Sequence, residues 1–161
     1  MARVAILTAS DKGAAGTRED LSGDVIASRT VAAGHDVVDR VVTPDDAAMI
    51  SDQLIRWCDR RIADVVVTTG GTGLTARDVT PEATRAVAER DVPGIPLALA
   101  LNGLTKTPYA ALTRGVAVTR GSTLIVNLPG SPKAVEEGMD VLLPLFAHIA
   151  ELLAGPVEHG A

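Results

Sequence analysis

The amino-acid sequence predicts an α/β fold with a largely parallel sheet in a single domain. Short runs of β-branched residues alternate with longer segments of helical periodicity, which is typical of strand–helix–strand units. The length of 161 residues suits one domain with a sizeable core. No internal repeat, low-complexity tract or linker interrupts the pattern. We therefore expect residues 1–161 to form one domain with a short tail after Gly155.

The first half of the chain predicts three strands. They are the β-branched runs at residues 4–7, 37–42 and 65–67. The third run is unbroken and apolar, so we expect it at the centre of the sheet with both faces covered.

Two helices separate these strands. The first has its apolar residues at 21, 25, 26 and 31, and Gly34 can end it in a left-handed conformation. Thr43 and Pro44 predict the N-cap and first turn of the second helix, with Asp46 as capping-box partner of Thr43. The apolar face of this helix is formed by Ala47, Ile50, Leu54 and Trp57.

The second half predicts two further strands in a hairpin, between helices. Thr80 and Pro81 repeat the cap-and-proline signature, and the helix should run to about Glu89. The Ala/Leu run within residues 92–104 is interpreted as a helix that begins after Pro96. The runs at 116–118 and 124–126 flank Arg120-Gly121-Ser122, which can turn a hairpin. Ser131-Pro132 opens the last helix, in which Pro144 should cause a kink or a restart.

Composition excludes several classes of protein. The net charge of −5 and the supply of only one Trp, one Tyr and one Phe argue against nucleic-acid binding. A lone cysteine, Cys58, excludes an internal disulfide and a cysteine metal cluster, and it suits a reducing compartment. No signal peptide is evident, and the apolar stretch Val141–Ala147 is far shorter than the ~20 residues that span a bilayer. We expect a cytoplasmic protein with no membrane partner.

The stretch Thr68-Thr69-Gly70-Gly71-Thr72-Gly73, here called the glycine loop, directly follows the third strand. Glycines allow sharp turns and close backbone approach, and backbone N–H groups with threonine hydroxyls can bind phosphate. An ordinary tight turn is the alternative. The loop lacks the Lys of a Walker motif. Residues 71–76 match the dinucleotide fingerprint only weakly, because no helix follows at once; Asp91, at the ribose-binding distance, does not end a predicted strand.

Two aspartates are expected beside this loop. Asp78 lies between the glycine loop and a helix start, and Asp45 follows the second strand. Each carboxylate could cap a helix, or the pair could hold Mg²⁺ that bridges bound phosphates. In a parallel sheet both lie at the carboxyl ends of strands, along the ligand crevice.

A second loop of the same kind, Asn127-Leu128-Pro129-Gly130-Ser131, precedes the last helix. Lys133 in the first turn opposes the helix dipole, so it faces either an anion or solvent. Ser10 and Asp11 follow the first strand and could touch a ligand, although a plain polar loop is the alternative. Two phosphate-type loops indicate a ligand pair with separated anionic groups, such as a nucleotide and a second phosphorylated molecule.

The glycine loop followed by Arg77-Asp78-Val79-Thr80-Pro81-Glu82-Ala83 resembles the MoaB/Mog family of molybdenum cofactor biosynthesis proteins. The stretch from Leu124 to Pro132 is also similar to that family, so the resemblance covers nearly the whole chain. It implies a three-layer α/β/α sandwich with a mixed, mostly parallel sheet and a molybdopterin-binding domain. It also implies a homotrimer or dimer of trimers that adenylylates molybdopterin with Mg-ATP and releases pyrophosphate, with a molybdate-inserting protein as a further partner.

The resemblance assigns catalysis and Mg²⁺ binding to Asp78 and Asp45. Thr113 occupies a position at which the family has serine near the pterin. The full expected substrate-binding set is Ser10, Asp11, Thr69, Gly70, Gly71, Thr72, Gly73, Thr113, Asn127, Pro129, Gly130, Ser131 and Lys133. The chain departs from the family at Leu97 and Ala100, where glutamate and arginine are usual. A binding homologue without catalysis is therefore the second hypothesis, and a nicotinamide dinucleotide protein the third.

Overall fold

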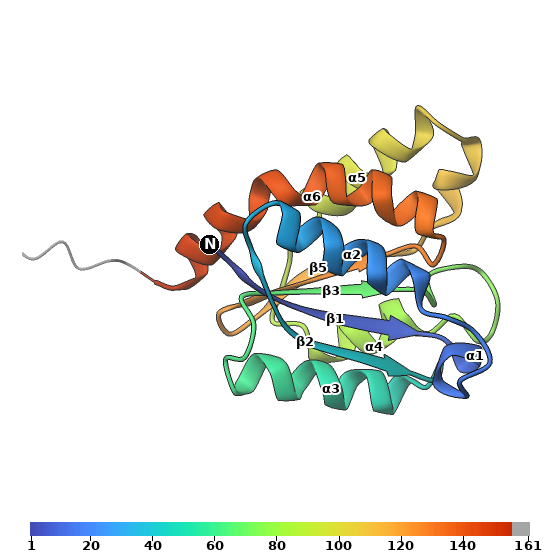
Figure 1. Cartoon of the computed structure of the whole chain (residues 1–161), viewed down its shortest axis with the longest axis horizontal. Coiled ribbons are helices and arrows are strands. Elements are labelled where there is room, and N and C mark those ends of the chain that lie inside the picture. Colours follow the sequence, from blue (N-terminus) through green and yellow to red (C-terminus); the bar gives the residue numbers. More distant parts are fainter. Residues whose placement is uncertain (156–161) are drawn as a thin grey trace, which may run out of the picture.

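A six-stranded mixed sheet forms the centre of the computed structural model, which describes residues 1–155 (Figure 1). Its strands lie in the order β2-β1-β3-β6-β5-β4. They are β1 (Arg3–Ala9), β2 (Asp36–Thr43), β3 (Val65–Thr69), β4 (Arg90–Asp91), β5 (Ala117–Arg120) and β6 (Thr123–Leu128). Strands β2, β1, β3 and β6 are parallel, whereas β5 is antiparallel to β6 and to β4. The expected hairpin is thus confirmed as β5–β6.

Helices cover both faces of the sheet and complete the expected three layers (Figure 1). One layer contains α2 (Leu21–Ala32), α5 (Gly94–Leu104) and α6 (Pro132–Leu153), and the other contains α3 (Ala47–Asp59) and α4 (Thr80–Val87). Two short helices, α1 (Asp11–Ala14) and the 3₁₀ helix η1 (Pro108–Leu112), lie in connections. No helix within residues 1–155 has the length and apolar character needed to cross a membrane.

Two hydrophobic cores lie on opposite faces of the sheet because successive strand residues point to opposite sides. In β1, Val4 and Ile6 pack with α2 and α6, whereas Ala5 and Leu7 pack with α3 and α4. All five residues of β3 are buried, so this strand is central and covered on both faces, as its apolar sequence predicted.

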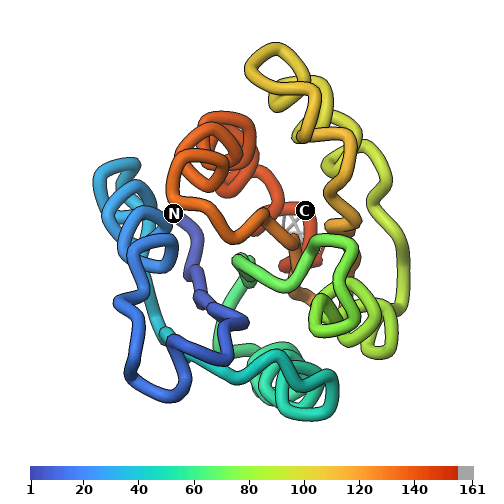
Figure 2. The backbone as a smooth tube through the Cα atoms, turned by 90° about the vertical axis from the view of Figure 1, so that its right-hand side faces the viewer, coloured from blue at the N-terminus to red at the C-terminus, as the bar shows by residue number. Residues whose placement is uncertain are grey.

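The parallel strands end at one edge of the sheet, which faces the viewer in Figure 2. Thr8 pairs with Thr69, Ala9 with Thr43, and Thr69 with Leu128, so the four strands end at a common level. From β1 the chain passes to β2 on one side of β1, and then to β3 on the opposite side of β1. This reversal of strand order leaves a crevice between the loops that follow β1 and β3, which is where α/β sheets bind ligands.

The helix starts after β2 and β3 differ from the prediction. Thr43 ends strand β2, paired with Ala9, and Asp46 is itself the N-cap of α3, its carboxylate accepting from Met49 N at 2.9 Å. The capping box of Thr43 and Asp46 was therefore wrong. Similarly, Thr80 is the first residue of α4 rather than its cap: Val79 is the N-cap, and the N–H of Thr80 donates to the carbonyl of Gly71.

Smaller differences concern helix lengths. Helix α4 ends at Val87, before Glu89, and α5 already begins at Gly94 because a proline such as Pro96 is compatible with a first turn. Helix α6 continues through Pro144 as one 22-residue helix, without a restart. Ser10 caps the short helix α1 in place of a plain loop, and the expected tail after Gly155 lies outside the described residues.

Candidate functional site

A polar cavity of about 600 Å³ lies at the strand-end crevice. It is bordered by the end of β1, the glycine loop, the start of α2 and the loop before α6. Its lining includes eight of the residues expected to bind substrate or metal: Ser10, Asp45, Thr69, Gly70, Gly71, Asp78, Gly130 and Ser131. Residues from four segments far apart in the sequence thus border one cavity.

The glycine loop needs its first two glycines because atoms of β1 and α4 lie directly against them. Gly70 has φ 88°, and a Cβ there would lie 2.4 Å from the carbonyl oxygen of Ala9 in β1. Gly71 has φ 67°, and its Cβ would lie 2.3 Å from the hydroxyl of Thr80. These close approaches bring the loop against β1 and α4, and so place its backbone on the cavity wall.

Asp45 lies in an acidic environment at the cavity. Its Oδ2 accepts from the N–H of Asp11 at 3.1 Å, and its own N–H donates to Asp11 Oδ1 at 2.9 Å. Burial raises the pKa of Asp45, and the nearby carboxylates of Asp11 and Asp78 raise it further. Arg77 neutralises Asp11 through two bonds of 3.0 and 2.8 Å and so lowers the pKa of Asp11.

Asp78 organises the end of the glycine loop and does not cap the next helix. Its Oδ2 accepts from both the N–H (2.9 Å) and the hydroxyl (2.7 Å) of Thr75. Burial raises the pKa of Asp78, but the bonds from Thr75 outweigh it and leave the pKa below its ordinary value. Helix α4 has Val79 as N-cap, with no side-chain cap bond. The capping alternative for Asp78 is therefore wrong.

The acids fit a weakly held Mg²⁺ better than a metal site made only of protein ligands. Within residues 1–155, no group of three or more His, Cys, Asp or Glu side chains is arranged to hold a metal. Mg²⁺ commonly takes one or two carboxylates together with substrate phosphates. Asp45 and Asp78 supply such a pair; burial raises the pKa of Asp45, and the neighbouring carboxylates of Asp11 and Asp78 add to this effect.

A second, mostly apolar cavity of about 310 Å³ adjoins the first. Of the expected residues it contains Thr72, Thr113, Asn127, Pro129 and Ser131, so that Ser131 lines both cavities. Asn127 is almost wholly buried and its amide is engaged with protein, donating to Thr68 and Thr84 and accepting from Val116 N. The remaining wall comes from α5, η1 and α6, and it includes Ala100, Tyr109 and Glu137.

Three expected residues line neither cavity. Gly73 lies against the Asp78 carboxylate, Asp11 is ion-paired with Arg77, and Lys133 is exposed in the first turn of α6.

The dinucleotide alternative is also disfavoured. Asp91 does end a strand, contrary to the prediction, but this is the two-residue outer strand β4, remote in strand order from the crevice.

Residue patterns missed several polar side chains that shape the site. Arg114 donates to the carbonyls of Gly73 and Asp78, each at 2.8 Å, and pairs with Glu82, so it holds the glycine loop to α4. Asp20 and Ser22 line the polar cavity at the start of α2. Asp20 could have been found as a helix N-cap signal.

Fold and site together define an α/β ligand-binding domain with two adjoining cavities at the carboxyl ends of its parallel strands. The chain belongs to the family described as "Probable molybdopterin binding domain", which matches residues 5–148. The predicted family relationship and the mixed-sheet sandwich are thereby confirmed.

Individual relatives agree with this membership. The molybdopterin adenylyltransferase of Helicobacter pylori J99 is 37% identical over 159 residues, covering 94% of this chain and 88% of the relative. The MoaB crystal structure from Thermus thermophilus is 47% identical with a TM-score of 0.90, covering 97% of this chain and 98% of that one. The molybdenum cofactor synthesis protein cinnamon of Drosophila melanogaster is 39% identical over 155 residues; these cover 95% of this chain but 26% of that longer protein.

Replacing Gly70 with alanine tests the close approach to β1. We expect Gly70→Ala to lower the free energy of unfolding by about 2–5 kcal/mol, from left-handed strain plus the clash with Ala9. Gly16→Ala is the matched control, since Gly16 has φ 74° with open space around it, and it should cost only ~1–2 kcal/mol. Urea unfolding measures both; equal losses would show that the clash is unimportant.

Asp45 should destabilise the fold at neutral pH. Its pKa is raised, so the folded state favours the protonated acid. At pH values above this pKa the carboxyl group ionises, and the free energy of unfolding falls. Asp45→Asn should therefore have the higher Tm at pH 7. The difference should shrink as the pH falls towards the ordinary aspartate value of 3.8. Thermal unfolding across this range is the measurement, with the exposed Asp52→Asn in α3 as control. A Tm difference that is constant with pH would contradict the assignment.

Proposed function

We propose that the protein acts in molybdenum cofactor biosynthesis by transferring the adenylyl group of Mg-ATP to molybdopterin, with release of pyrophosphate. The observation that carries the proposal is the pair of adjoining cavities that share Ser131. A transfer between two substrates needs both bound side by side, with their reacting groups at the junction. The Helicobacter relative is a molybdopterin adenylyltransferase, and this chain matches 88% of its length, which supports the same reaction.

Each cavity suits one substrate. The polar cavity offers backbone N–H groups of the glycine loop and the acid pair, which suits a triphosphate with its cation. The second cavity, whose exposed wall is mostly apolar and which has Thr113 and Glu137 among its polar side chains, suits a flat pterin ring that hydrogen-bonds along its edge. We therefore assign the nucleotide to the former and molybdopterin to the latter.

In the proposed reaction an oxygen of molybdopterin attacks the α-phosphorus of ATP, the bond to the β-phosphate oxygen breaks, and pyrophosphate leaves. Phosphoryl-type transfer depends mostly on positioning and on stabilisation of negative charge. The N–H of Gly71 and the shared Ser131 hold the phosphates, while Asp45 and Asp78 orient the nucleotide through its cation. Mg²⁺, when bound, neutralises phosphate charge.

Incubation of the protein with molybdopterin and Mg-ATP tests the proposal. Pyrophosphate should be released and adenylylated molybdopterin should accumulate. A control without protein sets the background, and release no greater than this background would refute the enzyme assignment.

A non-catalytic molybdopterin-binding protein is the second candidate, and one observation favours it. Ala100 presents no charge to the apolar cavity, and Leu97, three residues earlier on α5, is 60% exposed. These are the positions where the family carries arginine and glutamate. Tight molybdopterin binding without pyrophosphate release would favour this candidate.

We further propose a cytoplasmic homotrimer or dimer of trimers that passes its product to a molybdate-inserting protein. A row of exposed apolar side chains on α5 and η1 supports self-association. It comprises Leu97, Leu101, Leu104, Tyr109 and Leu112. The molybdenum cofactor biosynthesis bifunctional protein of Chlorobaculum tepidum supports a link to a further activity. It is 37% identical over 153 residues, and this chain covers 49% of its length. Sedimentation would determine the oligomeric state.

Replacing Asp78 separates orientation of substrate from folding. Asp78→Asn keeps an oxygen that can accept from Thr75, so the Tm should change little. Loss of the carboxylate charge should lower kcat by at least ~10²-fold, the scale for an oriented catalytic group. Pyrophosphate release and thermal unfolding are measured together, with Asp52→Asn as control. An active but destabilised variant would assign Asp78 a purely structural role.

A further inference from the structure

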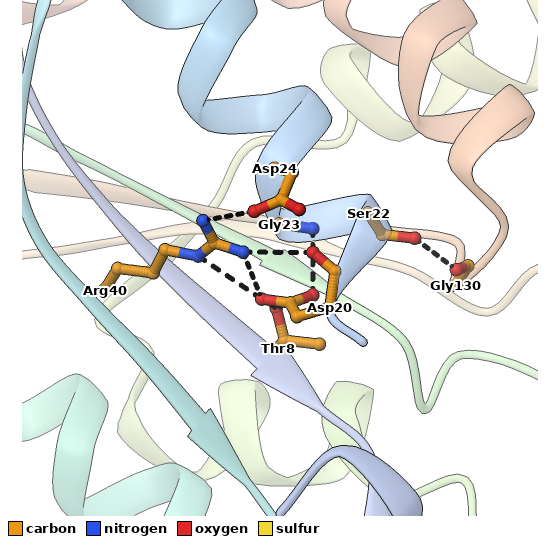
Figure 3. Close-up of polar contacts among 7 residues, drawn as sticks. All are labelled: Thr8, Asp20, Ser22, Gly23, Asp24, Arg40 and Gly130. Atoms are coloured by element: carbon orange, nitrogen blue, oxygen red, sulfur yellow. Dashed lines mark hydrogen bonds and ion pairs between the residues drawn. The ribbon is translucent and has the colours of Figure 1, made fainter. Parts of the chain in front are cut away.

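The start of α2 is fixed to two strands by polar side chains that the proposed reaction does not use. Arg40 of β2 reaches across to Asp20, the N-cap of α2 (Figure 3). Its Nη2 lies 2.7 Å from Asp20 Oδ2 and 3.0 Å from the Asp20 carbonyl oxygen, and its Nη1 lies 2.7 Å from Asp24. The hydroxyl of Thr8 and the N–H of Gly23 complete the bonds to the Asp20 carboxylate, each at 2.9 Å.

This cluster is rigid because its central ion pair is largely shielded from water. The side chain of Asp20 is 12% exposed and that of Arg40 31% exposed. Removing one partner of such a pair leaves a poorly solvated charge, so the pair resists opening. The first turn of α2 is therefore held in place relative to β1 and β2.

Ser22 extends this fixed turn to the loop before α6. Its side chain is buried, and its hydroxyl donates to the carbonyl of Gly130 at 2.6 Å (Figure 3). From the adjacent strand β3, the hydroxyl of Thr69 donates to the carbonyl of Pro129 at 2.7 Å. Two successive carbonyls of the loop are thus held by hydroxyls from two different elements.

These two bonds determine where the loop's N–H groups point. Every peptide bond described is trans, and in a trans peptide the carbonyl and the following N–H point in opposite directions. The N–H of Gly130 is therefore turned away from Thr69, and the N–H of Ser131 away from Ser22. Neither N–H donates a hydrogen bond within residues 1–155. Both residues lie on the cavity wall, and Ser131 stands where the two cavities meet.

We propose that Ser22 is a positioning residue that orients the Gly130–Ser131 peptide through the Gly130 carbonyl, so that the free N–H groups of Gly130 and Ser131 bind a phosphate oxygen of the substrate. Asp20, Arg40 and Thr8 fix Ser22 in turn. The inference deepens the proposed function and rests on it for the identity of the phosphate. Donors oriented before the substrate arrives need no reorganisation during the reaction.

The test compares Ser22→Ala, which removes the hydroxyl, with Ser22→Thr, which keeps it. Ser28→Ala is the matched control, because Ser28 is exposed on the same helix and donates only to the Val25 carbonyl. Two measurements are made on each variant: pyrophosphate release with molybdopterin and Mg-ATP, and binding of AMP followed by the amide resonances of Gly130 and Ser131. AMP serves as the probe because it carries a single phosphate.

In the unsubstituted protein, AMP should shift both amide resonances. Ser22→Ala should weaken AMP binding several-fold and lower kcat at least ~10-fold with a smaller change in KM, as expected when oriented groups are loosened. Ser22→Thr should restore both quantities, and Ser28→Ala should leave them unchanged. AMP binding that leaves these amides unshifted, or that is equally strong in Ser22→Ala, would overturn the inference. Absence of pyrophosphate release from the unsubstituted protein would instead overturn the proposed function, and the AMP titration would still decide the inference.

Discussion

Parallel pairing of β1 with both β2 and β3 is the constraint on which the site depends. Because these strands and β6 run in the same direction and end in register, the four loops that follow them meet at one edge. The loops themselves bury little apolar surface, since the two cores lie behind them on the sheet faces. Their conformations depend instead on hydrogen bonds between loops and on close backbone approach at Gly70.

Three carboxylates lie close together at this edge. Asp11, Asp45 and Asp78 bring negative charge together, and only Asp11 is directly paired with a cation, Arg77. Asp20, which lines the same cavity, is paired with Arg40. Of the three carboxylates, only that of Asp45 has a raised pKa, so its ionisation is the one that costs the folded state stability at neutral pH.

Sequence patterns predicted five of the six strands, most helices and the positions of the two glycine-containing loops, because β-branched runs and glycine-rich stretches are local signals. They failed where a long-range contact determined the outcome. Thr43 resembles a helix cap beside Pro44, but pairing with Ala9 keeps it in β2. The contacts of Arg40 with Asp20 and of Ser22 with Gly130 join residues 20 and 108 positions apart, and only the folded sheet brings them together. The side chains that orient the loops were therefore not predictable from local patterns, whereas the N-caps Asp20 and Ser131 do carry a local signal.

The shared wall at Ser131 has a thermodynamic consequence. A segment that borders two cavities cannot move for one ligand without altering the shape offered to the other. If the first ligand shifts this segment, the affinity of the second cavity for its ligand changes. Linkage then requires the second ligand to change the affinity for the first by the same factor. Gly130 adds to this dependence: a Cβ there would lie 3.3 Å from the Cα of Gly70, so the two loops can shift only as neighbours in contact. A ligand in one cavity would thus act on the other through a few residues of backbone.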